Sequence, residues 1–110
     1  AASDVYKRQV VMEVEAEMKA LTSMLGELTR DPSNPTLAVL GTREGGGRII
    51  VASTEGSLAE ERHNALEILN SISVHISGGG GGSRTMAQGG GSNPDGIPQA
   101  LDSAREILGL

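Results

Sequence analysis

Residues 77–101, SGGGGGSRTMAQGGGSNPDGIPQAL, are the most distinctive stretch of this 110-residue chain, because half of its 16 glycines lie within residues 78–91. Glycine loses more conformational freedom on folding than any other residue, so this density needs a reason. One interpretation is a flexible linker. The other is a backbone surface without side chains, where phosphates can approach bare amides. Because Met86, Ala87 and Gln88 interrupt the glycines, we favour the second and predict an exposed glycine-rich loop at residues 78–91.

Known nucleotide-binding and catalytic motifs do not fit this segment. A Walker loop ends in Gly-Lys-Ser/Thr, but the chain has no lysine after Lys19, and no register of the glycines satisfies G-x-G-x-x-G. The chain lacks cysteine, its only histidines are His63 and His75, and no serine lies in a G-x-S-x-G elbow. We therefore expect no catalytic residue, no metal site and no cofactor in this fragment.

The flanking sequence predicts a small sheet with two helices packed on it. Three short apolar runs rich in β-branched residues predict strands: TLAVL at 36–40, IIVAS at 49–53 and SVHIS at 73–77. Ser57 and Glu60 form a capping box that predicts a helix over residues 58–69. A last helix is expected over residues 98–108, and Gly109 ends it.

The N-terminal third predicts a long amphipathic helix over residues 10–30. Its apolar residues are spaced like a heptad seam, and prolines at 32 and 35 end it; the seam consists of Val11, Val14, Met18, Leu21, Leu25 and Leu28. We expect residues 10–28 to associate through this seam, either with a second copy of the chain as a homodimer or with another helix. Residues 1–9, AASDVYKRQ, show no periodicity, and we interpret them as a non-native leader.

Length and composition indicate one α/β (α+β) domain over residues 36–110, preceded by the helix. A chain of 110 residues is too short for two independent cores. No apolar run approaches the roughly 20 residues of a membrane span, so we expect no membrane partner. The net charge of −5 argues against a strongly basic nucleic-acid binder, but residues 68–94 contain no Asp or Glu.

The glycine run followed by Met86, Ala87, Gln88 and more glycines resembles the closing motif of the C-terminal domain of alanyl-tRNA synthetases. This module belongs to the DHH-associated domain family, which also closes DHH phosphoesterases, where a histidine follows the glycines. Here Gly82 is followed by Ser83 and Arg84, which favours the synthetase branch. Many synthetase members have arginine directly after the glycines and Pro-Asp before Met-Ala-Gln, whereas Arg84 is displaced by one position.

The resemblance implies a cytoplasmic module that binds tRNA, specifically tRNA-Ala, at its elbow and assists aminoacylation and editing by a parent alanine-tRNA ligase. The fragment itself would not be an enzyme. The residues expected to bind nucleic acid are Gly78, Gly79, Gly80, Gly81, Gly82, Arg84, Gln88, Gly89, Gly90 and Gly91. Two alternatives stay open: the substrate-binding end of a DHH phosphoesterase, and a plain dimerisation domain. Arg43 and Arg48 flank the loop between the first two predicted strands and could add phosphate contacts, but we favour their interpretation as solvated surface residues.

Overall fold

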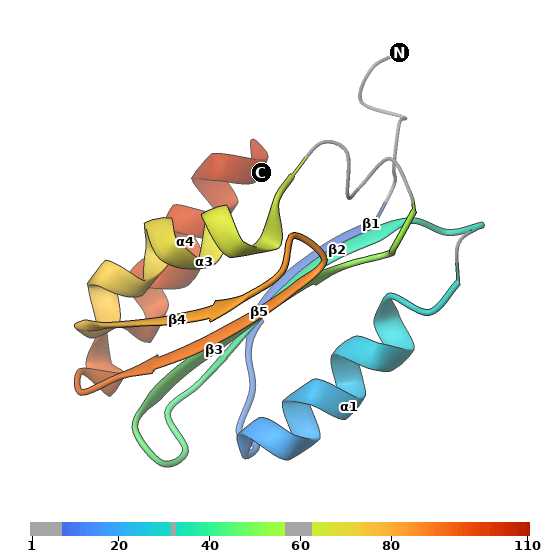
Figure 1. Cartoon of the computed structure of the whole chain (residues 1–110). Coiled ribbons are helices and arrows are strands. Elements are labelled where there is room, and N and C mark those ends of the chain that lie inside the picture. Colours follow the sequence, from blue (N-terminus) through green and yellow to red (C-terminus); the bar gives the residue numbers. More distant parts are fainter. Residues whose placement is uncertain (1–7, 32, 57–62) are drawn as a thin grey trace.

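The computed structural model describes residues 8–31, 33–56 and 63–110. In this part of the chain one five-stranded sheet has the order β1-β2-β3-β5-β4 (Figure 1). β1 is parallel to β2, and every other neighbouring pair is antiparallel. The strand bounds are Arg8–Glu13 for β1, Thr36–Thr42 for β2, Gly47–Ser53 for β3, Gly78–Gly82 for β4 and Met86–Gly91 for β5.

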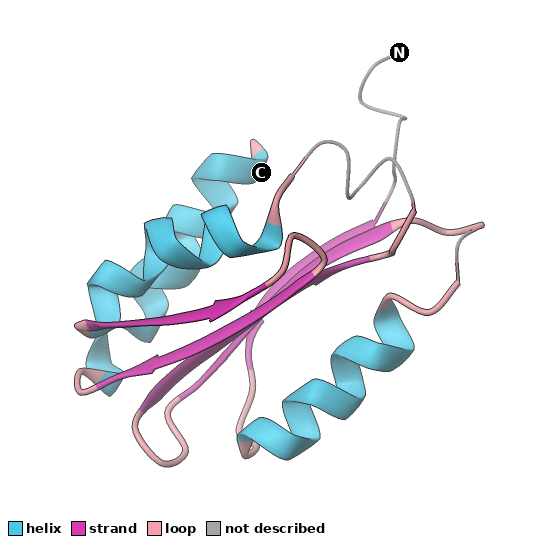
Figure 2. Ribbon diagram, in the orientation of Figure 1, coloured by secondary structure: helices cyan, strands magenta, loops and turns pink. Residues whose placement is uncertain are grey.

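Helices cover both faces of this sheet, so the predicted α+β class is confirmed (Figure 2). α1 (Met18–Leu28) lies on one face, and α3 (Ala65–Ile72) and α4 (Ile97–Leu108) lie on the other. The 3₁₀ helices η2 (Ser73–Ile76) and η3 (Pro94–Gly96) connect the elements on the α3 and α4 side. Among the described residues, no helix is long and apolar enough to span a membrane.

The central strands are buried on both faces because each face has its own apolar core. Leu37 and Val39 of β2 pack toward α3 and α4, whereas Ala38 and Leu40 pack toward α1. The same alternation continues in β3, as expected when successive side chains of a strand point to opposite faces. A sheet covered on both sides gives continuous apolar runs, which explains why TLAVL and IIVAS were recognisable as strands.

The predicted helix over residues 10–30 is wrong in its first part, where residues 8–13 form β1. Val10 packs in the core on the α1 side, and Val11 packs in the core on the α3 and α4 side. Only a strand sends adjacent side chains to opposite faces, and β-branched residues favour that conformation. The helix begins only at Met18, so the long N-terminal helix is replaced by a strand and a shorter helix.

Arg8 and Gln9, the last residues of the segment that we interpreted as a leader, belong to β1 and are therefore part of the fold. Arg8 Nε donates to Thr36 Oγ1 at 2.8 Å, and Arg8 Nη2 donates to the Leu28 carbonyl at 2.5 Å. These bonds join β1 to β2 and to the end of α1. Residues 1–7 of the proposed leader lie outside the described part of the chain.

The apolar seam that we expected to form a dimer interface packs against the chain's own sheet. Leu21 and Leu25 are 0% exposed in the core between α1 and the sheet. Val14, Met18 and Leu28 pack around this core. The residues assigned to dimerisation therefore already have an intrachain partner.

Three further predictions are corrected or confirmed along the C-terminal half. Of the helix predicted over 58–69, the structure describes residues 63–69, in which Asn64 has extended backbone angles and caps α3, so that α3 begins at Ala65; residues 57–62, with the predicted capping box of Ser57 and Glu60, lie outside the described residues. Residues 73–76 form η2, and the next strand is the glycine run itself. The last helix is confirmed: Ile97, Leu101, Ala104 and Leu108 are buried, and Gly109 ends it with φ 75°.

Candidate nucleic-acid interface

The glycine-rich segment is a β-hairpin at the edge of the sheet, so the predicted loop at residues 78–91 is wrong. β4 contributes the five glycines from Gly78 to Gly82, and β5 contains Gln88 and the glycines at 89–91. The register joins Gly78 to Gly91 and Gly82 to Ala87. β4 is exposed along its whole length, and Gln88 is exposed on β5. The fold therefore brings the predicted site residues together on one hairpin.

Close approach of the two backbones explains why every second position of β4 must be glycine. A Cβ atom added to Gly78, Gly80 or Gly82 would overlap the backbone of β5. Gly82 also has φ 150°, which side chains rarely adopt. Alternate glycines of β4 are thus required by the hairpin itself, and glycine's low strand propensity explains why the sequence pattern suggested a loop.

The other glycines of β4 have a different environment. A Cβ atom added to Gly79 or Gly81 would meet nothing within 4 Å. Internal packing therefore leaves room for side chains at these two positions. Their absence leaves exposed backbone amides and carbonyls at the edge of the sheet. Such a surface can accept a ligand at close range.

Arg84 lies in the turn between β4 and β5, and its backbone is fixed by neighbouring elements. The Arg84 carbonyl accepts a hydrogen bond from the Ala65 amide at 2.9 Å, at the start of α3. On either side, the Ser83 amide donates to the Met86 carbonyl at 2.8 Å, and the Ser53 amide donates to the Thr85 carbonyl at 2.9 Å. The Arg84 side chain is exposed. The turn thus holds a guanidinium at one end of the hairpin.

The nearby N-terminus of α3 is not available for an anion. Asn64 Oδ1 accepts hydrogen bonds from the amides of Leu66 and Glu67, and the Arg84 carbonyl accepts from Ala65. The first-turn amides that usually attract phosphate are therefore already paired. Any anion at this end of the hairpin must be held by side chains or by the glycine backbone.

Gln88 marks the face of the hairpin on the α1 side of the sheet. It pairs with Ile50, whose side chain is buried against α1, and paired residues of adjacent strands share a face. α1 itself packs on β2 and β3. Gln88 is therefore solvent-exposed beside the region that α1 covers.

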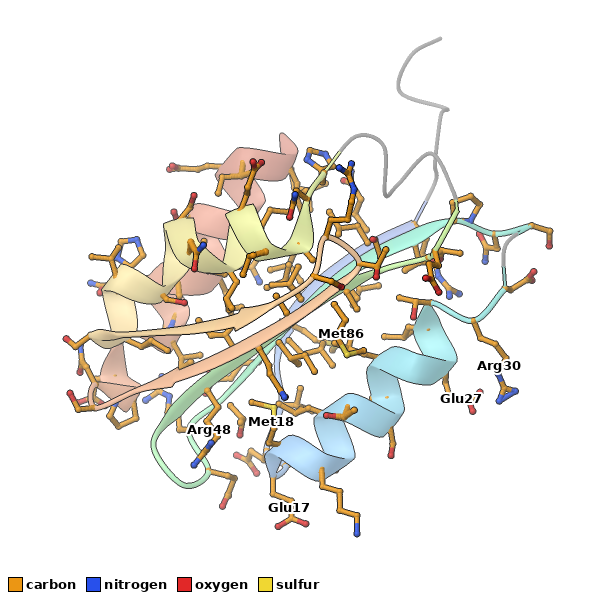
Figure 3. The ribbon with its side chains drawn as sticks, in the orientation of Figure 1. Glu17, Met18, Glu27, Arg30, Arg48 and Met86 are labelled. Atoms are coloured by element: carbon orange, nitrogen blue, oxygen red, sulfur yellow. The ribbon has the colours of Figure 1, made fainter. Side chains whose placement is uncertain are left out.

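Arg48 of β3 lies on this same face and was not assigned to the site from the sequence. It pairs with Gly90, and Figure 3 shows its side chain on the α1 side of the sheet, near Met18. It also lines an open hollow together with Glu17, Met18, Lys19, Glu44 and Gly45. Arg48 is far from the glycine run in sequence, and the two become neighbours only because β3 pairs with β5. The sequence alone therefore did not predict that Arg48 lies beside the hairpin.

The described residues contain no group of three His, Cys, Asp or Glu side chains that could hold a metal ion. His75 lies in η2, where its carbonyl accepts a hydrogen bond from Asn93 Nδ2 at 3.1 Å. His63 lies before α3 beside Asn64 and Glu67.

Comparison with known proteins gives a consistent picture. The DHHA1 domain family matches residues 6–110. The chain is 30% identical over 94 residues to alanine-tRNA ligase 1 of Lachnoclostridium phytofermentans, covering 86% of this chain and 11% of the ligase. It is 35% identical over 94 residues to the alanine-tRNA ligase of Methanococcoides burtonii, covering 84% of this chain and 10% of the ligase. The chain thus spans about a tenth of the length of these ligases.

The fold is also similar to a solved structure, the C-Ala domain of alanyl-tRNA synthetase from Aquifex aeolicus. The TM-score is 0.68 at 29% sequence identity, and the match covers 94% of each chain. β1 lies within the segment that the family match covers, which agrees with its place in the sheet.

Proposed function

The chain belongs to the DHHA1 domain family, and on that premise we propose that it is the tRNA-binding C-terminal module of an alanine-tRNA ligase. In this proposal the module holds tRNA-Ala for aminoacylation and editing by domains outside this chain. It acts in the cytoplasm and needs neither a cofactor nor a catalytic residue of its own.

The observation that carries the proposal is the bare edge of the β4–β5 hairpin. Gly79 and Gly81 lack side chains although the fold leaves space for them. Positions that packing does not restrict to glycine are explained if a ligand approaches the backbone there. Arg84 and Gln88 supply a guanidinium and an amide beside this edge, both suited to phosphate and ribose oxygens.

The net charge of −5 is compatible with a small anion-binding region because the acidic residues are unevenly distributed. The acid-free residues 68–94 extend from within α3, after Glu67, through η2, β4 and β5. The whole hairpin therefore lies within this segment. A phosphate at the hairpin meets no carboxylate from its own two strands.

The two alternative functions are less well supported. The relatives reported above are ligases, which favours the synthetase over the phosphoesterase. A plain dimerisation domain relied on the apolar seam, but Leu21 and Leu25 are buried inside the chain.

A filter-binding titration of the purified chain with an alanine-specific tRNA transcript tests the proposal. We expect saturable binding that weakens as salt increases, because phosphate contacts release counterions. A duplex DNA of similar length is the comparison ligand, and we expect it to bind more weakly. Absence of tRNA binding at low salt would overturn the proposal.

A further inference from the structure

Arg48 lies across the glycine backbone of β5. A Cβ atom added to Gly90 would lie 3.8 Å from both Cγ and Nη1 of Arg48, and one added to Gly45 would lie 3.5 Å from its Nε. The arginine side chain therefore extends between two glycines, at the end of β5 opposite Arg84. Arg48 is exposed to solvent there.

Most arginines of the described chain already have a partner. Arg43 pairs with Glu13 at 2.9 Å, Arg30 with Glu27 at 2.7 Å and Arg105 with Asp102 at 2.7 Å (Figure 3 labels Arg30 and Glu27). Within residues 8–31, 33–56 and 63–110, the Arg48 guanidinium has no hydrogen-bond or ion-pair partner. An uncommitted guanidinium on an open sheet face remains able to bind an anion.

Arg48 and Gln88 are diagonal neighbours on the same face, because Gln88 pairs with Ile50 and Arg48 precedes Ile50 by two residues. Diagonal neighbours on antiparallel strands lie roughly 7–8 Å apart, within reach of long side chains. Gly90 lies directly opposite Arg48, and Gly79 lies opposite Gly90 on the next strand. Gly79 and Gly90 therefore form a surface without side chains, and Arg48 and Gln88 lie beside it.

We propose that Arg48 is a further phosphate contact of bound RNA, and that the RNA backbone follows β5 from the turn carrying Arg84 toward Arg48. This inference rests on the proposed function, and it adds Arg48 as a contact and the direction in which the RNA backbone crosses the sheet. From residue 85 to residue 90 the strand rises roughly 17 Å at about 3.4 Å per residue. The two arginines thus mark opposite ends of a path, with Gln88 between them.

Nearby carboxylates provide an independent test of where the phosphate lies. Glu44 and Glu17 line the same open hollow as Arg48 and Lys19. Glu17 precedes α1 but makes no side-chain capping bond, so Glu17→Gln removes no cap. If a phosphate binds at Arg48, neutralising Glu44 or Glu17 strengthens RNA binding, because a like charge near the phosphate is removed.

The experiment measures binding of an alanine-specific tRNA transcript at several salt concentrations. Arg48→Ala is expected to weaken binding about three- to tenfold at low salt and to reduce the log–log salt slope by about one. Arg48→Lys is expected to restore the slope, because the charge is retained. Glu44→Gln is expected to tighten binding. Arg30→Ala, an exposed arginine paired with Glu27, is the matched control and should leave binding unchanged.

The outcomes separate this inference from the proposed function. If folded Arg48→Ala binds like the parent while Arg84→Ala loses affinity, the tRNA function stands and the role of Arg48 is overturned. If the parent does not bind tRNA, both fail together. If Arg48→Ala lowers the melting temperature and Arg48→Lys does not restore the slope, Arg48 is structural and the inference is again overturned.

Discussion

Glycine occupies adjacent positions of β4 for different physical reasons. At Gly80, an added Cβ would overlap the carbonyl of Gln88, so the hairpin requires glycine there. At Gly81, an added Cβ meets nothing within 4 Å. A substitution at Gly80 therefore tests the hairpin, whereas the same substitution at Gly81 tests the approach of a ligand.

We predict that Gly81→Val weakens tRNA binding while the protein keeps its melting temperature, because valine suits a strand and finds open space. Gly80→Val is expected to destabilise the fold by about 1–3 kcal/mol, because its side chain is forced into the β5 backbone. Thermal unfolding by circular dichroism and filter binding measure the two effects. Normal tRNA affinity in Gly81→Val would show that RNA does not contact this edge.

For Arg84 we predict that Arg84→Ala loses tRNA affinity while the turn of the hairpin is kept. The backbone bonds of the turn, including the bond from Ala65 to the Arg84 carbonyl, are unchanged by Arg84→Ala. One lost phosphate contact reduces the slope of log affinity against log salt by about one. A titration at four salt concentrations checks this, and an unchanged slope together with unchanged affinity would contradict it.

At the scale of elements, the sequence predicts the helices and strands whose pattern of apolar and polar side chains corresponds to their buried and exposed faces. β2 and β3 are apolar and β-branched, and α4 has one buried stripe, so all three were predictable. β1 was not, because its valines also fit a helical spacing and its partner β2 lies far along the chain. β4 was not predictable either, since strand propensity comes from side chains that glycine lacks.

Substitutions in α1 test whether its apolar seam stabilises the fold of the single chain. We predict that Leu25→Ala lowers the free energy of unfolding by about 2–5 kcal/mol, because Leu25 is 0% exposed in the core beneath α1. Met24→Ala, at a position that is 36% exposed, is the neighbouring control and should change stability by less than about 1 kcal/mol. Urea denaturation measures both variants.

Sedimentation of the parent and the same variants distinguishes a seam that packs within one chain from a seam that forms an interface between two copies. Because Leu21 and Leu25 are buried within one chain, we expect the parent to sediment as a monomer. A dimeric parent that dissociates in Leu25→Ala without loss of stability would instead identify the seam as an interface between copies.

At the scale of the whole molecule, part of the candidate site follows from sequence and part only from topology. The glycines, Arg84 and Gln88 share one short segment, so their grouping was visible along the chain. Arg48 lies 30 residues before Gly78 in the sequence, and antiparallel pairing of β3 with β5 brings it opposite Gly90. No local pattern distinguishes Arg48 from an ordinary solvated arginine.

The charge of the whole chain leads to the last prediction, which concerns the salt dependence of the parent protein. A chain of net charge −5 repels a polyanion at long range, so binding must depend on a few local contacts. Each phosphate contact contributes about −0.9 to the log–log salt slope on a double helix. Two arginines, Arg84 and Arg48, therefore predict a slope of about −2 for the parent and near zero for the double alanine variant. Filter binding across a range of salt concentrations measures the slope directly. A parent slope of about −4 or steeper would mean that RNA contacts more cations than this hairpin and its neighbouring strand provide.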